Sequence, residues 1–239
     1  MFQYIPSGDS AVIIKAGDEI SEEINLTVRK LLVRIEHENI IGVIDFIPSY
    51  NELMICYDPS IISSRKLLDT LRTLETNIDT IELPESEIIH VPVFYGSQSG
   101  PDLNEVASRN NLSEEEVVKI HTSGSYKVYM LGFTPGFCYL GGMDQRIATP
   151  RKQSPRLIIP AGAVGIAEKQ TGIYPIASPG GWQLIGKTPL RLFDPAKKPE
   201  FLIQAGDYIK FYPITEYEFK DILKEVNEGV YRVNKSKYS

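Results

Sequence analysis

The stretch from Gly132 to Asp194 constrains the fold more than any other part of this 239-residue chain. Its 63 residues hold ten of the 18 glycines and seven of the 16 prolines, placed between short apolar runs. Glycine permits tight turns and close backbone approach, whereas proline removes a hydrogen-bond donor from a helix or a sheet. The composition therefore argues against long helices here and predicts short, bent strands, as in a closed or nearly closed barrel.

The same stretch is basic within an acidic protein. It carries seven Lys and Arg residues against three acids, whereas the whole chain has a net charge of −6. A basic, glycine-rich segment that also bears aromatic residues indicates a surface for an anionic small molecule or an acidic partner. The pI of about 5.2 argues against general nucleic-acid binding, which depends on neutralising phosphates.

The remaining bulk features exclude several classes of protein. No apolar run reaches the roughly 18 residues of a membrane span, and no charged segment followed by an apolar one marks a signal peptide. We therefore expect a cytoplasmic protein that does not contact membranes. Cys56 and Cys138 form no CxxC pair, and His37 and His90 are isolated, so neither a disulfide framework nor a metal site is predicted.

Residues 1–80 are predicted to form a small α/β sandwich. Short apolar runs at 2–5 and 11–15 flank a turn, and two more at 43–48 and 53–57 predict a hairpin. Apolar residues at helical spacing follow Ser21 and Ser63, which are plausible N-caps. Two helices packed on one side of a sheet would bury both apolar stripes.

Residues 88–239 are predicted to form a second, β-rich domain with peripheral helices. We expect strands at 88–95 and 126–131, two short helices between them, and a closing hairpin of 201–204 with 208–212. Thr215 and Glu218 form a capping box for a last helix, which is predicted to bury Phe219, Ile222, Leu223 and Val226. The two short helices resemble a helix-turn-helix, but three glutamates against one lysine on the second argue against DNA binding.

Arg151 and Arg156 lie in the repeated tripeptides TPR and SPR, five residues apart. A guanidinium group binds carboxylate or phosphate in a bidentate manner, and the prolines would hold the backbone in place. The alternative is ordinary ion pairing with acids elsewhere in the chain. Both interpretations remain open at this stage.

Lys187 lies in a segment, GWQLIGKT, that matches the phosphate-loop pattern G-x-x-x-x-G-K-S/T. Such a loop must follow a buried strand and open a helix. Here strand-forming residues fill the pattern and Pro189 follows it, so a nucleotide-binding loop is not expected. Lys187 is a candidate contact for an anion or, alternatively, a solvated lysine.

Aromatic and polar side chains among the glycines supply further candidates for a binding cleft. Aromatic rings provide apolar walls, and neutral side chains provide hydrogen bonds. The candidate binding residues are Phe133, Phe137, Tyr139, Gln170, Thr171, Tyr174 and Trp182. His121 is a candidate general acid or base; alternatively, a protonated imidazole there interacts with the end of its helix.

Five segments of this stretch carry a resemblance to a known family: GFTPGFCYLGG, TPR, PAGAVGIA, QTGIYP and SPGGWQLIGKTPLRLFD. Together they resemble the family of the 5-oxoprolinase B subunit, the bacterial kinase A inhibitor and allophanate hydrolase subunit 1. The resemblance runs through nearly the whole chain. It implies an α+β protein in which an N-terminal α/β sandwich precedes a cyclophilin-like β-barrel. Cys138 departs from the family, which more usually has proline at that position.

The resemblance also implies a function. It implies a component of a bacterial ATP-dependent 5-oxoprolinase, inactive alone and working with the companion A and C subunits, with ATP used by the complex. Arg151, Arg156 and His121 are then the candidate catalytic residues. The alternative is a regulatory protein that inhibits a sensor histidine kinase through its barrel. A part of a urea carboxylase is a third possibility, although those domains are usually fused into longer chains.

Overall fold

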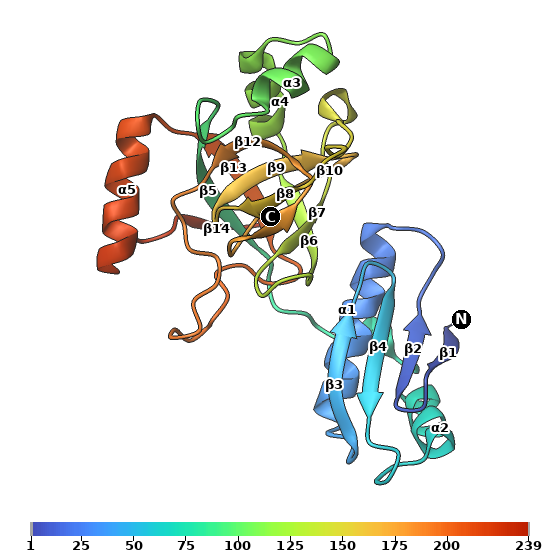
Figure 1. Ribbon diagram of the computed structural model, residues 1–239. Coiled ribbons are helices and arrows are strands. Elements are labelled where there is room, and N and C mark those ends of the chain that lie inside the picture. The colour runs from blue at the N-terminus through green and yellow to red at the C-terminus, as the bar shows by residue number, and fades with distance from the viewer. Residues whose placement is uncertain (1, 239) are drawn as a thin grey trace. The chain divides into compact units, whose positions relative to one another are not determined.

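The computed structural model describes residues 2–238. The chain folds into two compact units, one ending at Pro84 and the other starting at Glu85 (Figure 1). Within the described residues, no helix is both long and apolar enough to cross a membrane.

The first unit is a four-stranded antiparallel sheet with two helices. The strands lie in the order β1-β2-β4-β3; their bounds are β1 Gln3–Ser7, β2 Ala11–Lys15, β3 Val43–Pro48 and β4 Glu52–Tyr57. Side chains alternate between buried and partly exposed along β2 and β4, as expected of strands with one covered face. The covered face packs against α1 (Glu22–His37) and α2 (Ser64–Leu74) in a single core.

The N-caps predicted for these helices are confirmed. The Ser21 hydroxyl accepts from the backbone N–H of Ile24, and the Ser63 hydroxyl accepts from that of Lys66. A short 3-10 turn, Ile78–Thr80, follows α2 and buries Ile78 in the same core. Most of the segment after α2 is irregular and leads to Pro84.

The second unit is built on an eight-stranded sheet. Seven strands follow the order β10-β9-β12-β5-β13-β6-β7, and β14 pairs with β5. Only the pairing of β13 with β5 is parallel within this sheet. The end strands β10 and β7 contact each other, so the sheet curls into a nearly closed barrel. The bounds are β5 Glu87–Tyr95, β6 Tyr126–Leu131, β7 Cys138–Gly141, β9 Ala163–Ala167, β10 Gln170–Ile173, β12 Gln183–Lys187, β13 Tyr208–Pro213 and β14 Lys235–Lys237.

A separate antiparallel pair and three helices surround the barrel. The pair is β8 (Arg156–Ile159) with β11 (Ser178–Gly180). Helices α3 (Leu103–Arg109) and α4 (Glu114–Ser123) lie side by side at one end of the barrel, and α5 (Glu216–Glu228) runs along its flank (Figure 1). A 3-10 turn, Gln145–Ile147, precedes the β8 segment. The chain is therefore an α+β protein with an N-terminal sandwich and a C-terminal barrel, as the sequence predicted.

Two local predictions in the second unit were wrong. Residues 201–204 do not form a hairpin with β13, because β5 and β6 already occupy both edges of that strand. Instead, Phe201 bridges to Phe193. Helix α5 begins at the predicted Thr215 capping box but buries none of its residues fully. It packs against β5 on one side only, so Leu223 is exposed and Ile222 is half-buried.

Candidate functional site

Arg156 is the first residue of β8, and a buried acid holds its guanidinium group. Its Nη2 atom donates to both carboxylate oxygens of Asp102, at 2.7 and 2.8 Å. Its Nη1 atom donates to the Trp182 carbonyl at 3.3 Å. Asp102 directly precedes α3, and only 5% of its surface is exposed. Arg156 therefore connects β8 to the start of α3 and to the segment before β12.

Lys152 and Gln183 extend this ion pair into a network. Lys152 Nζ lies 3.0 Å from Asp102 Oδ1 and 3.0 Å from Glu105 Oε2. Gln183 Nε2 donates to the Pro150 carbonyl at 3.0 Å and to Glu105 Oε1 at 3.4 Å. We call Asp102, Glu105, Lys152, Arg156 and Gln183 the Asp102 network. It joins α3, the 150–156 segment and β12.

Two opposing effects set the pKa of Asp102. Burial disfavours the carboxylate, but hydrogen bonds from Arg156, the backbone N–H of Leu184 and Lys152 outweigh burial and hold the pKa below its ordinary value. The bond from Leu184 N to Asp102 Oδ2 measures 2.7 Å. Asp102 is thus ionised at neutral pH, and its charge balances the cations around it.

Arg151 lies beside this network but outside it. The side chain is exposed and has no hydrogen-bond or ion-pair partner among residues 2–238. Its charge reaches the hydroxyl of Tyr174, a buried residue. Burial raises the pKa of Tyr174 to about 12, an increase that the positive charge of Arg151 and a hydrogen bond from the backbone of Trp182 only partly offset. Arg151 therefore remains available to an anion next to a phenol that stays protonated.

The five candidate aromatic residues form one set centred on Phe137. Its ring lies 5.6 Å from that of Phe133, 5.2 Å from that of Tyr139 and 5.7 Å from those of Tyr174 and Trp182, all edge to face. Phe137, Tyr174 and Trp182 are buried and Tyr139 is half-buried. The sequence placed these rings in one group, and the structure brings them into contact.

Two glycines make room for this packing. A Cβ atom at Gly172 would stand 3.1 Å from the Trp182 ring and 3.4 Å from that of Phe137. A side chain at Gly180 would meet the Tyr174 hydroxyl at 2.4 Å. The glycines therefore let the rings approach the strands closely, which accounts for their frequency in this stretch.

Phe133 differs from the other four rings because it is 65% exposed. Its φ of 61° lies in the left-handed region, where a bulky residue is a genuine outlier. The hydroxyl of the next residue, Thr134, is buried and has no hydrogen-bond partner among the described residues. Strained backbone and unsatisfied buried polar groups cluster at functional sites in proteins, which makes this loop a candidate.

His121 lies in the interior of the barrel. Its Nδ1 atom is 2.7 Å from the Tyr95 hydroxyl and its Nε2 atom is 2.8 Å from Thr171 Oγ1. Because the Thr171 hydroxyl donates to the Gly165 carbonyl, it accepts from Nε2–H, and Nδ1 accepts from Tyr95. Burial lowers the pKa of His121 from 6.5 to about 3. The imidazole is therefore neutral at pH 7, and the protonated interaction with the helix end is not formed.

Comparison with known proteins identifies the family. Residues 2–203 match the family described as the carboxyltransferase domain, subdomains C and D. A Bacillus subtilis protein named as the B subunit of 5-oxoprolinase is 48% identical over 95% of this chain and 98% of its own length. An Escherichia coli O157:H7 protein of the same name is 41% identical over 87% of this chain and 94% of its own. The chain belongs to the 5-oxoprolinase B-subunit family.

Solved structures show the same fold in longer proteins. The structure of TTHA0988 matches 86% of the present chain, with a TM-score of 0.76 and 38% sequence identity. The matched part is 40% of the TTHA0988 chain. The Kluyveromyces lactis urea carboxylase matches over 99% of this chain with a TM-score of 0.81 and 22% identity, but this chain spans 24% of it. At that identity, the second likeness establishes the fold alone.

The remaining candidate site residues, Lys187, Gln170 and Thr171, lie on strands of the barrel. Lys187 is the last residue of β12 and is half-buried. Most of the phosphate-loop pattern that contains Lys187 is this strand, and no helix follows it, as the sequence predicted. Gln170 is the first residue of β10, and Thr171, next to it, faces His121. Within residues 2–238, no group of three or more His, Cys, Asp and Glu side chains is arranged to hold a metal ion.

Cys138 starts β7 and is fully buried. Burial, with a smaller contribution from Asp207, raises the pKa of its thiol to about 12. The thiol is therefore protonated at neutral pH and is not a nucleophile in this structure.

The structure thus brings most of the candidate site residues into two separate groups. Arg151, Arg156 and the aromatic set lie together around β8 and β11, whereas His121 and Thr171 contact each other inside the barrel. Sequence reasoning missed Asp102, Glu105 and Gln183. Asp102 was seen only as the start of a helix, and no pattern connects it with an arginine 54 residues later.

Proposed function

We propose that this chain is the B subunit of an ATP-dependent 5-oxoprolinase, which opens 5-oxo-L-proline to L-glutamate with the companion A and C subunits. The observation that carries the proposal is the likeness to proteins of that name over nearly the full length of both chains. The phosphate-loop pattern is a strand without a following helix, which fits a chain that acts only beside companions that hold the nucleotide.

The chemistry explains why ATP is needed. A five-membered lactam is a resonance-stabilised amide and a poor electrophile. In the proposed reaction, ATP transfers its γ-phosphoryl group to the lactam oxygen and leaves as ADP. Water then adds to the activated carbon, and breakage of the C–N bond with release of phosphate gives glutamate. Such a site needs cations for phosphate and carboxylate and apolar walls that exclude water.

Arg151 is the residue we assign to anion contact in this reaction. It is the arginine of the TPR and SPR pair that is exposed and unpaired, whereas Arg156 is held by Asp102. Arg156 is then a positioning residue, since the network fixes the segment from which Arg151 projects. Lys187 is a second candidate contact for an anion. Phe133 and Tyr139, which both pack against Phe137, supply the apolar wall.

The buried candidate residues have a structural role in this proposal. Neutral His121, bonded to Tyr95 and Thr171, holds β10 against β5 and α4 rather than reaching substrate directly. Phe137 packs against the Phe133 ring, and Tyr174, which the charge of Arg151 reaches, packs with Trp182 on Phe137. Gln170 begins β10, the strand that holds Thr171. A proton transfer by His121 would require an opening of the barrel, because the imidazole is fully buried.

Exposed apolar side chains fit an assembly of several different chains. Leu157 and Ile158 on β8 are 87% and 73% exposed, beside the segment that holds Arg151. Large apolar side chains gathered on a surface indicate a contact site for another protein. We therefore assign β8 to the contact with a companion of the complex. Leu157→Asp should reduce co-purification of the companions while the circular dichroism spectrum of the isolated chain is unchanged.

The decisive experiment measures glutamate and ADP formed from 5-oxoproline and ATP. The purified chain is assayed alone and after co-expression with the products of its neighbouring genes. We expect turnover in the mixture only. Arg151→Ala should lower that turnover by about tenfold or more, since it removes a charged contact to the reacting anion.

Arg146→Ala is the matched control, because Arg146 is an exposed arginine paired with Asp144 in the same stretch. It should leave turnover unchanged. An assembled mixture that yields no glutamate would contradict the proposed reaction. Equal turnover of wild type and Arg151→Ala in an active mixture would contradict the role of Arg151 only.

A further inference from the structure

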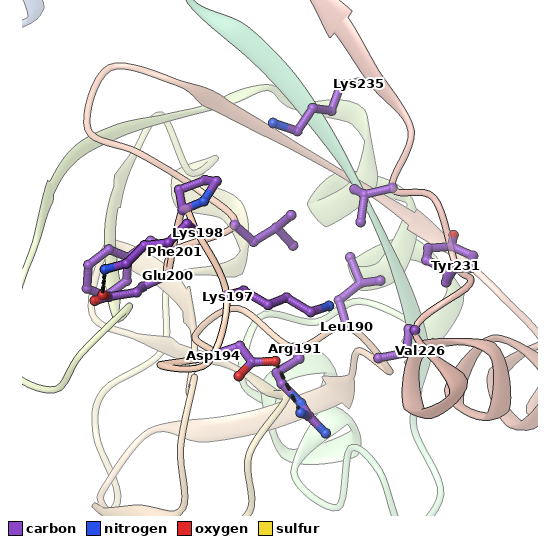
Figure 2. A pocket seen from close by; sticks show the side chains of 14 residues that line it. Leu190, Arg191, Asp194, Lys197, Lys198, Glu200, Phe201, Val226, Tyr231 and Lys235 are labelled. Atoms are coloured by element: carbon purple, nitrogen blue, oxygen red, sulfur yellow. Dashed lines mark hydrogen bonds and ion pairs between the residues drawn. The ribbon is translucent and has the colours of Figure 1, made fainter.

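A pocket of the second unit contains none of the residues assigned to the candidate site. It lies between the 190–202 segment, the end of α5 and the C-terminal tail, and has a volume of about 410 Å³ (Figure 2). Ligand pockets in proteins commonly measure about 300–1,000 Å³. Two segments that are distant in sequence, 190–202 and 226–235, thus line a space suited to a small molecule.

The floor of this pocket is apolar. Leu190 is buried, and four further apolar lining residues are partly buried against the main core of the unit: Leu202, Val226, Tyr231 and Val233. Because these side chains extend a packed core, the floor is held in place independently of any ligand. It offers an apolar surface to the body of a small molecule.

The walls are positively charged. Four cations and two acids line the pocket, in a chain whose net charge is negative. Three of the cations are paired: Arg191 Nη1 lies 3.3 Å from Asp194 Oδ2, Lys235 Nζ lies 2.7 Å from Glu87 Oε2, and Lys198 pairs with Glu200. These three charges are largely balanced.

Lys197 is different. Its ammonium group has no hydrogen-bond or ion-pair partner in the described part of the chain, and its side chain extends across the pocket toward Leu190 (Figure 2). Its backbone is fixed, because Lys197 N donates to the Asp194 carbonyl at 3.1 Å and Ala196 N donates to Asp194 Oδ1 at 3.1 Å. The turn at 194–197 therefore places the unpaired ammonium group of Lys197 next to the apolar side chains of the pocket.

We propose that this pocket binds a small organic anion, with its carboxylate or phosphate on Lys197 and its apolar part against Leu190, Leu202 and Val233. An ammonium group is a compact charge that pairs with either anion, and burial of the apolar part adds to the affinity. The proposal is independent of the proposed reaction, since no residue assigned to that reaction lines the pocket.

The experiment titrates the isotope-labelled full chain with three probes and follows backbone amide shifts by NMR. Benzoate and phenyl phosphate carry an apolar ring with a carboxylate or a phosphate, and inorganic phosphate carries no apolar part. At least one ring-bearing probe should shift amides within 190–202 and 226–235 in a saturable manner. Inorganic phosphate should bind about tenfold more weakly than that probe.

Two neighbouring lysines give a matched pair of variants. Lys197→Gln should weaken binding of the ring-bearing probe by about tenfold, since it removes the charged contact. Lys198→Gln should change it by less than about twofold, because Lys198 is 86% exposed and paired with Glu200. The proposal is overturned if neither ring-bearing probe shifts these segments, or if the two variants weaken binding equally. Because no turnover is measured, failure here leaves the 5-oxoprolinase assay unaffected.

Discussion

Two cation-rich regions of the second unit differ in whether their positive charges are balanced. In the Asp102 network, Arg156 and Lys152 share a buried carboxylate and hold three parts of the fold together. In the pocket of Figure 2, Lys197 stands unpaired over apolar side chains. The first arrangement stabilises the unit, whereas the second leaves a charge for a ligand.

The comparison shows that a local excess of basic residues does not tell which of them are free. The stretch with TPR and SPR was the most conspicuous basic feature of the sequence, yet of the two arginines in these tripeptides, Arg156 is fully paired. Its partner acid lies 54 residues earlier in the chain. Lys197 lies outside that stretch, in a run of lysines and prolines without a motif.

The largest effect is expected for Asp102→Asn. This change leaves Arg156 and Lys152 without their buried counter-charge, and removal of one partner of a buried ion pair costs about 3 kcal/mol or more. Urea unfolding followed by the fluorescence of Trp182, the only tryptophan of the chain, measures the loss in this unit. Asp144→Asn, which breaks an exposed pair with Arg146, should cost less than about 1 kcal/mol. Equal costs for the two variants would show that the network does not stabilise the unit.

The dependence of the unfolding free energy on pH should distinguish the buried, neutral His121 from the ion-paired Asp102. The folded state holds His121 neutral down to a pKa of about 3, whereas the unfolded state binds a proton below pH 6.5, so stability falls as pH falls between these values. The slope is at most about 1.4 kcal/mol per pH unit. The contribution of Asp102, whose pKa is lowered, is present above its ordinary value of 3.8 and is lost only below it.

His121→Gln should therefore flatten the decline in stability between pH 6 and 4, measured by urea unfolding at each pH. His90→Gln is the control, because that histidine is only half-buried and bonds to Ser236 near the surface. A decline that is equally steep in the wild type and in His121→Gln would rule out a neutral, buried imidazole as its cause.

A smaller loss is expected for Lys152→Gln. Lys152 contacts both Asp102 and Glu105 but is partly exposed, and Arg156 still pairs with Asp102 when it is removed. We expect a cost of about 1 kcal/mol by the same unfolding measurement. A loss as large as that of Asp102→Asn would mean that Lys152, rather than Arg156, is the main partner of the carboxylate.

The smallest change in stability is expected for the lysine-to-glutamine substitution in the pocket, Lys197→Gln. Lys197→Gln removes no side-chain hydrogen bond or ion pair within the described chain, so stability should change by less than about 0.5 kcal/mol. Thermal unfolding of the two glutamine variants side by side provides the comparison. A clear destabilisation by Lys197→Gln would show that this lysine is structural and would remove the distinction between the two regions.

Elements whose signals are local were predictable from sequence. Ser21, Ser63 and Thr215 were assigned as N-caps, and each caps the expected helix. The hydroxyl and the amide it bonds lie within three residues, so the sequence contains both partners. The prediction for 201–204 failed because the edges of β13 were already taken by strands from distant parts of the chain.

The C-terminal tail shows the same limit. Its polar composition predicts a frayed end, but Lys235–Lys237 pairs with β5 as β14 and Lys235 forms an ion pair with Glu87. A three-residue polar strand has no pattern of its own. It exists because β5 offers an edge and an acid at the right place.

By itself, the sequence determined the α+β class, the family and the grouping of the aromatic residues with Arg151. Those conclusions depend on residue spacing and on motifs that read along one chain. Only the tertiary structure decided that Arg156 is paired, that His121 is neutral and that Lys197 is free. These three conclusions concern the charge state and the burial of a side chain. Charge state and burial depend on groups that are distant in sequence and that only folding brings close. Asp102 pairs with an arginine 54 residues later, and Thr171 bonds to a histidine 50 residues earlier.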